Sequence, residues 1–200
     1  MTEFHDMEFV IQRFETENNI KEDVKLAEES TVIYKQIEAM VKQSKLLNYY
    51  QQELNFENVN YSIISDKLEQ FSSFHKYWNF IKLWHSQQKV WMLSQFKHLN
   101  LKAVKMIEIT EQGQELVCNL LQTLNKNSAI YPNVLELEKE VNIFLNYLEI
   151  VINLKKEYFN EQHYEMLFSK MYTKKKLPKD NKLNLRQLLD DNLMEYQELI

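Results

Sequence analysis

The sequence contains one glycine, Gly113, and two prolines among its 200 residues. β-Hairpins depend on glycine where the backbone needs a positive φ, and phosphate-binding loops depend on it where the backbone approaches the ligand closely. The nucleotide-binding motifs G-x-x-x-x-G-K-[ST] and G-x-G-x-x-G each require at least two glycines. The sequence therefore excludes both motifs within these residues, and it predicts an all-α fold with no sheet.

Cysteine is almost absent as well, because Cys118 is the only one. It lies in an apolar helical pattern, so we expect a packed, unreactive thiol in a reducing compartment. The acidic N-terminal residues lack the arrangement of a signal peptide, and no run of about 18 uncharged apolar residues occurs. These features predict a soluble, intracellular protein.

No charge of one sign dominates the sequence. The 29 acidic and 24 basic residues are interspersed and give a formal net charge of −5. Binding to nucleic acid or to a membrane surface requires a concentrated basic face, so we expect neither partner. The basic run at residues 174–176, followed by Lys179, is better interpreted as a solvated loop than as a contact for an acidic partner or lipid.

Apolar residues recur at helical spacing along most of the chain, and 44% of the residues are hydrophobic. The predicted helices cover residues 19–52, 61–98, 101–125, 133–156, 160–171 and 185–200. Asn19 and Glu22 form a candidate capping box, and residues 55–60 form a break. At about 1.5 Å per residue the second helix would approach about 55 Å, which predicts an elongated bundle.

The predicted organisation has three parts. Residues 1–171 form a helical portion, residues 172–184 form a polar loop with Pro178 that is a candidate hinge, and residues 185–200 begin the next helices. The amphipathic pattern continues to residue 200, so we expect the chain to be an excerpt of a longer polypeptide.

Candidate catalytic and metal-binding residues do not form a recognisable motif. His75, His85 and His98 are separated by ten and thirteen residues, whereas ligand pairs on a helix are three or four residues apart. Glu138 and Glu140 lack the Glu-x-x-His partners of a di-iron site. We therefore expect no catalytic, cofactor-binding or metal-binding residues in this segment.

Three tryptophans, Trp78, Trp84 and Trp91, are the most unusual compositional feature. They are six and seven residues apart on one predicted helix, so they lie near one helical stripe. Such a stripe could form a buried seam between helices or an exposed interface. The buried seam is the favoured interpretation.

Several short segments together resemble the N-terminal part of the linker region of dynein heavy chains. These segments are the pair Leu83-Trp84 with Trp91 downstream, the run Glu161-Gln162-His163-Tyr164, and the run from Asn184 to Leu193 with leucines at 185, 188 and 189. The resemblance spans about residues 20–200. In that family the second run is E-R-H-W, so Gln162 replaces an arginine and Tyr164 replaces a tryptophan, and any ion pair of that arginine is lost here.

The resemblance implies a lever rather than a catalyst. In this family ATP and Mg²⁺ bind in an AAA+ ring that lies C-terminal to the linker, and the linker bends over the ring to drive movement along microtubules. The implied partners are that ring, dynein intermediate and light chains or other heavy chains, and microtubules through the full motor. The implied location is the cytoskeleton, in particular the axoneme of a cilium. His163 and Tyr164 are expected to pack between helices as structural residues.

Two other functions are consistent with the sequence. A free-standing helical adaptor could bind partner helices in an aromatic groove, and its native chain would end near residue 200. A helical-bundle enzyme with a site assembled from distant residues is a third hypothesis, and it would contain a bound metal or cofactor.

Overall fold

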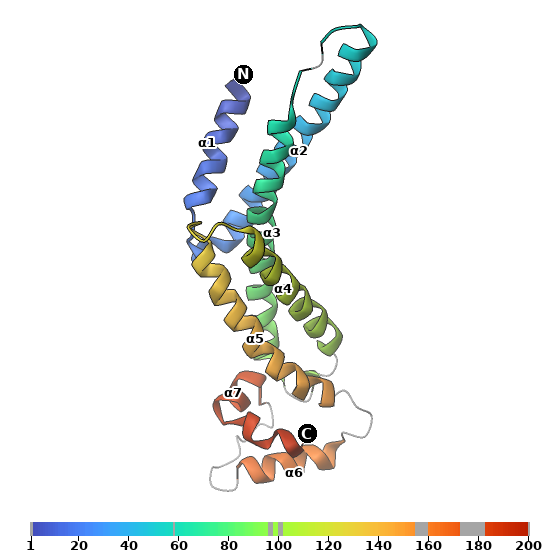
Figure 1. Ribbon diagram of the computed structural model, residues 1–200. Coiled ribbons are helices and arrows are strands. Elements are labelled where there is room, and N and C mark those ends of the chain that lie inside the picture. The colour runs from blue at the N-terminus through green and yellow to red at the C-terminus, as the bar shows by residue number, and fades with distance from the viewer. Residues whose placement is uncertain are drawn as a thin grey trace. The chain divides into compact units, whose positions relative to one another are not determined.

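The computed structural model describes residues 2–57, 59–95, 98–99, 102–154, 160–172 and 183–199. These residues form an all-α protein (Figure 1), and the only β-type pairing among them is an isolated bridge between Gln95 and Asn184. The helices are α1 (Thr2–Thr16), α2 (Asp23–Glu53), α3 (Ser62–Leu93), α4 (Ala103–Thr123), α5 (Tyr131–Leu154), α6 (Glu161–Met171) and α7 (Leu185–Asp190). Two 3-10 helices, η1 (Ile20–Glu22) and η3 (Leu193–Leu199), complete this list. The predicted all-α fold is confirmed.

The observed helices differ from the predicted ones at Asn19, after Asp190, and at the C-terminal end of α3, which lies at Leu93 rather than at about residue 98. Asn19 does cap the chain locally, but it caps η1, and its own backbone N–H donates to Glu17 rather than to Glu22. The predicted helix 185–200 is divided because Asn192 adopts a positive φ of 64° after α7. Most of the predicted hinge, residues 173–182, lies outside the described residues.

Helix α1 was not predicted, although its sequence carries a helical signal. Met7, Ile11 and Phe14 are spaced by four and three residues. Ile11 and Phe14 are buried, and the Phe14 ring meets Phe71 of α3 edge to face at 5.4 Å. Polar contacts from Arg13 to Glu29 add a link to α2. Burial of two large apolar side chains therefore explains why this segment is a helix in the folded chain.

The chain forms two compact units, each with its own set of helical segments. Unit 1 comprises Met1–Leu83 and Leu116–Glu136, and unit 2 comprises Trp84–Glu115 and Leu137–Ile200. The divisions fall within α3, α4 and α5, so each of these helices contributes residues to both units. Trp78 and Leu83 belong to unit 1, whereas Trp84, Trp91 and the runs at 161–164 and 184–193 belong to unit 2.

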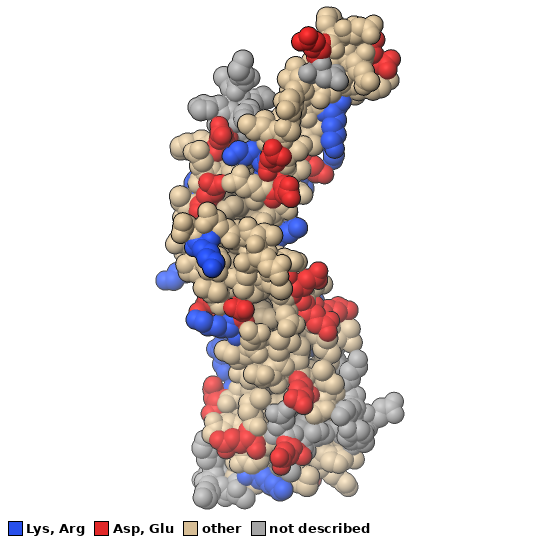
Figure 2. All heavy atoms as spheres, viewed as in Figure 1, with Lys and Arg blue, Asp and Glu red and all other residues tan. Residues whose placement is uncertain are grey.

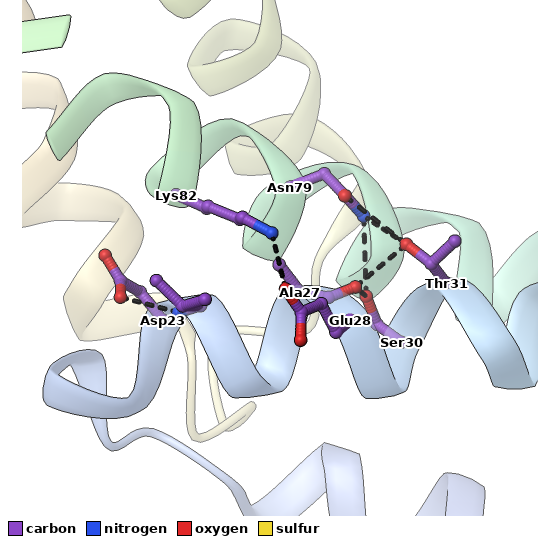
Figure 3. Close-up of polar contacts among 8 residues, drawn as sticks. Asp23, Ala27, Glu28, Ser30, Thr31, Asn79 and Lys82 are labelled. Carbon is purple, nitrogen blue, oxygen red and sulfur yellow. Dashed lines mark hydrogen bonds and ion pairs between the residues drawn. The ribbon is translucent and has the colours of Figure 1, made fainter. Parts of the chain in front are cut away.

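In unit 1, α2 and α3 are joined by an apolar core and by a row of polar contacts. The buried face of α2 carries Leu26, Ile33, Ile37 and Val41. Beside this face, Thr31 and Ser30 of α2 contact the side-chain amide of Asn79 on α3, and the Lys82 ammonium lies 2.9 Å from the Glu28 carboxylate (Figure 3). The contacts among Ser30, Thr31 and Asn79 satisfy polar groups that are partly buried, whereas the Lys82–Glu28 pair is exposed.

His75 of α3 lies beside these polar contacts between α2 and α3. Its ring stacks on Tyr34 at 4.4 Å, and its Nδ1 lies 3.0 Å from the Asn79 amide nitrogen. Burial lowers the pKa of His75 below its ordinary value near 6.5, and the neighbouring Lys76 lowers it further. The folded chain therefore favours the neutral imidazole, whereas the unfolded chain does not.

We expect the stability that depends on neutral His75 to be fully present above pH 6.5 and to be lost as the pH falls below that value. The reason is that the unfolded chain then binds a proton that the folded chain binds less well. Urea denaturation at pH 7.5 and pH 5.5 measures the change in unfolding free energy. His75→Gln should reduce this change, whereas the same replacement of the exposed His98 should leave it intact. An equal change in the two variants would contradict the prediction.

Cys118 differs from its predicted environment. The thiol is exposed on α4 rather than packed, and it lies 3.5 Å from the amide nitrogen of Gln122. The apolar neighbours in the sequence, Val117 and Leu120, are buried on the inner face of α4. Because consecutive helical residues point about 100° apart, an apolar stretch still places some positions on the solvent side.

Candidate functional site

The tryptophans of α3 are buried, as the interpretation of a seam predicted. Trp78, Trp84 and Trp91 are at most 1% exposed. In unit 2, the rings of Trp84 and Trp91 meet edge to face at 6.1 Å, and Phe144 of α5 contacts the first at 5.5 Å and the second at 5.1 Å. These three rings, called here the aromatic seam, lock α3 to α5 through large and rigid contact surfaces.

A hydrogen bond fixes the orientation of the aromatic seam. The Trp84 indole Nε1–H donates to the Glu140 carboxylate over 2.8 Å. A carboxylate acceptor makes such a bond stronger than one between neutral groups, particularly where water is scarce. Glu140, considered above only as one of a pair with Glu138, is therefore an anchor for the indole. The bond adds a polar link between α3 and α5 within unit 2.

Trp78 and Leu83 have different roles from the aromatic seam. Trp78 is fully buried in unit 1 against Tyr77, whose ring lies edge to face at 5.0 Å. Its indole Nε1–H has no hydrogen-bond partner, so the side chain contributes through packing. Leu83 is half-buried. Because the units divide between Leu83 and Trp84, one tryptophan belongs to unit 1 and two belong to unit 2.

The run Glu161-Gln162-His163-Tyr164 forms the first turn of α6. Asn160 precedes it as the N-cap and accepts from the backbone N–H groups of Gln162 and His163. His163 completes a capping box, because its Nδ1 accepts from the Asn160 backbone N–H over 3.1 Å. Glu161 is exposed, and its charge is favourable at a helix N-terminus. His163 is half-buried and Tyr164 is buried, so Tyr164 is the packing residue of this run.

Replacing His163 with alanine is expected to lower the melting temperature. The variant loses the side-chain acceptor of a reciprocal capping box, a change that typically costs about 0.5–2 kcal/mol. Circular dichroism during heating measures the shift. Gln162→Ala, at the neighbouring exposed position, is the matched control and should change the melting temperature little. No shift for His163→Ala would show that the histidine is not a structural residue.

The leucine run at 185–193 docks onto the end of α3. Asn184 caps α7 in a reciprocal box with Gln187. The Leu185 backbone N–H donates to the Ser94 carbonyl over 3.2 Å, next to the bridge between Asn184 and Gln95. Leu185 and Leu188 are at most 1% exposed, and Leu189 is half-buried. Segments about 90 residues apart in the sequence are therefore held together by backbone hydrogen bonds.

Helices α6 and α7 are also linked at their C-terminal ends. The Tyr172 hydroxyl donates to the Asp191 carboxylate over 2.8 Å. Burial raises the pKa of the Tyr172 hydroxyl well above its ordinary value, and the carboxylate raises it further, so the hydroxyl stays a proton donor. Sequence reasoning missed this pair because the two residues are 19 positions apart and belong to no motif.

In the described part of the chain, the motif residues pack helices together or cap them, and they do not surround a metal or catalytic centre. Among the described residues, no three His, Cys, Asp or Glu side chains come close enough to hold a metal ion together. None of the described helices is both long and apolar enough to span a membrane. On the face that Figure 2 shows, acidic and basic residues are interspersed. In structural class, this part is an all-α helical protein with an aromatic seam.

Comparison with known proteins gives the family. Residues 64–200 match the family model described as dynein heavy chain, N-terminal region 2. The match covers more than half of the chain, so the chain belongs to this dynein heavy chain family. No match was found among curated proteins, and none was found among solved structures.

The family match confirms the resemblance to dynein heavy chains for the residues that it covers. It begins within α3 and includes the aromatic seam, α6 and α7. Residues 20–63, which were also expected to resemble the family, precede the match. Membership identifies the chain as part of the N-terminal region of a heavy chain, which is consistent with a non-catalytic segment. It also indicates association with the cytoskeleton and assembly with other dynein subunits.

Proposed function

We propose that this chain is a segment of the mechanical linker of a dynein heavy chain. In this role it transmits ATP-driven changes of an AAA+ ring in the same heavy chain into movement along microtubules. ATP and Mg²⁺ would bind in the ring and not in this segment. The further partners would be dynein intermediate and light chains or other heavy chains, and the location would be the axoneme of a cilium.

The family match carries this proposal, and the structure of unit 2 supports it. A lever must resist bending where it carries load, and rigid contacts are needed at the ends of its helices. The aromatic seam joins α3 to α5, and the hydrogen bond between Leu185 and Ser94 joins α7 to α3. Trp84, Trp91 and Leu185, which carry part of the family resemblance, are among the residues that make these contacts.

The proposal is tested in the full-length motor by loosening the aromatic seam without removing a charge. Trp91→Leu removes the ring contacts with Trp84 and Phe144 and keeps an apolar side chain. We expect slower microtubule gliding while the ATPase rate of the ring is retained, because hydrolysis continues while less of each stroke is transmitted. Glu111→Gln, at an exposed position of α4, is the control. Unchanged gliding with Trp91→Leu, in a motor shown to carry the loosened segment, would contradict the lever role.

One observation favours the second candidate, an adaptor that binds partner helices. Apolar side chains around the connection between α2 and α3 are exposed, among them Leu54, Phe56 and Val59. Exposed apolar clusters are common at protein interfaces. An adaptor would function as a short independent chain, so the native size of the polypeptide distinguishes the two candidates.

A further inference from the structure

Unit 1 contains a polar cavity that the proposed lever role does not use. Its volume is about 480 Å³, within the range of ligand-binding pockets. Glu15 of α1, Gln70 and Ser73 of α3, and the segment that ends α4 at residues 123–125 contribute to its wall, together with Asn127 and Ser128. The Gln70 side-chain amide donates to the Glu15 carboxylate, which holds both groups at the wall.

The wall of this cavity is complementary to a cation. Glu15 is its charged residue, and neither lysine nor arginine lines it. Helix α4 ends at the cavity with no basic residue in its last turn, so the negative end of the helix dipole is not offset by the helix itself. Lys126 is in the adjoining loop, but its side chain is exposed and is not part of the lining. Ser128 lines the wall, but its hydroxyl oxygen is buried from solvent and has no hydrogen-bond partner.

The loop that forms one side of the cavity is held by its own hydrogen bonds. The Asn127 backbone N–H donates to the Asn125 side-chain oxygen over 2.9 Å. The Ser128 backbone N–H donates to the Asn125 carbonyl over 2.9 Å, and the Tyr131 N–H donates to the Ser128 carbonyl. These contacts fix the polar groups before any ligand arrives, which lowers the entropy cost of binding.

A groove of about 640 Å³ continues the cavity along α3 and α4. The two hollows share Gln70, Ser73 and Thr123. The groove wall carries apolar side chains from Leu68 of α3 and from Leu116 and Leu120 of α4, beside polar and charged residues that include Glu69 and Lys76. A small cation would occupy the cavity and leave the groove empty. A polypeptide could place a basic side chain in the cavity and an apolar neighbour in the groove.

We propose that the cavity binds an arginine side chain of a partner polypeptide, with an adjacent apolar residue of that partner in the groove. Arginine fits better than lysine because its planar group presents five N–H donors to several acceptors at once. The acceptors here are the Glu15 carboxylate and the C-terminal end of α4. Phe74, which is 4% exposed, also lines the cavity.

The proposal is tested on the 200-residue chain with the blocked tripeptides acetyl-Leu-Ala-Arg-amide and acetyl-Leu-Ala-citrulline-amide. Citrulline has the shape of arginine without its charge. We expect the arginine peptide to shift the amide NMR signals of Gln70, Asn127 and Ser128, with a dissociation constant on the order of 1 mM for so small a probe. The citrulline peptide should leave these signals unchanged, and acetyl-arginine-amide should bind more weakly than the arginine tripeptide.

Two variants separate a specific site from general attraction to an acidic chain. Glu15→Gln should weaken binding of the arginine tripeptide by at least about tenfold, which corresponds to about 1.4 kcal/mol. Glu53→Gln, an exposed charge at the end of α2, should leave binding unchanged. Circular dichroism verifies that both variants remain folded. Equal binding of the two tripeptides would overturn the proposal, as would an equal loss of binding in the two variants. If acetyl-arginine-amide bound as tightly as the arginine tripeptide, the site would accept a small cation alone and the proposed polypeptide partner would be overturned.

Discussion

Replacing Trp84 with alanine is expected to lower the free energy of unfolding by about 3–5 kcal/mol. The side chain is fully buried, and its ring contacts both Trp91 and Phe144. The variant would leave a cavity between α3 and α5 and would also leave the Glu140 carboxylate without its indole donor. Urea denaturation followed by circular dichroism measures the loss.

A second replacement separates packing from the hydrogen bond. Trp84→Phe retains an aromatic ring but removes the Nε1–H donor, so its expected cost is smaller, about 1–3 kcal/mol. Val90→Ala, an exposed position on the same helix, is the control and should stay within about 0.5 kcal/mol. If Trp84→Ala cost as little as Val90→Ala, the aromatic seam would not be a principal source of stability in unit 2.

Replacing Leu188 with alanine is expected to lower the free energy of unfolding by about 2–5 kcal/mol. Leu188 is fully buried in α7, a helix of six residues. So short a helix does not persist without tertiary packing, because helix nucleation is unfavourable. The loss of this side chain should therefore release α7 from the end of α3 as well as create a cavity. Hydrogen exchange of the Leu185 amide, which donates to the Ser94 carbonyl, should become faster.

Arg186 supplies the comparison within the same helix. Its side chain is exposed, so Arg186→Ala should change the unfolding free energy by no more than about 0.5 kcal/mol. Fast exchange of the Leu185 amide in Arg186→Ala, or slow exchange in Leu188→Ala, would show that Leu188 does not hold α7 in place.

Helices α2 to α6 could be predicted from the sequence, apart from their exact ends, because apolar periodicity is a local signal. The stripe from Leu26 to Val41 and the aromatic positions of α3 are buried as the spacing requires. The division after Asp190 could not be predicted in this way. A positive φ at Asn192 interrupts a continuous amphipathic pattern, and leucine spacing carries no information about one backbone angle.

The burial of the three tryptophans was predictable from the sequence, but their contact partners were not. Tryptophan spacing indicated a seam, yet nothing in the sequence connects Trp84 to Glu140 across 56 positions. The role of His163 also depends on a neighbour, because its half-buried imidazole caps α6 only together with Asn160. Contacts between distant residues arise from the fold, whereas the pattern of a sequence reports mainly on burial and on local geometry.

The most direct test of the proposed linker role is the native size and behaviour of the polypeptide that contains this segment. An antibody against the segment would detect that polypeptide in its source, for comparison with the 24.3 kDa of these 200 residues. A chain many times heavier that sediments with microtubules and is released by ATP is the expected result. A native chain near 24.3 kDa that ignores microtubules would contradict the linker role and favour the helical adaptor.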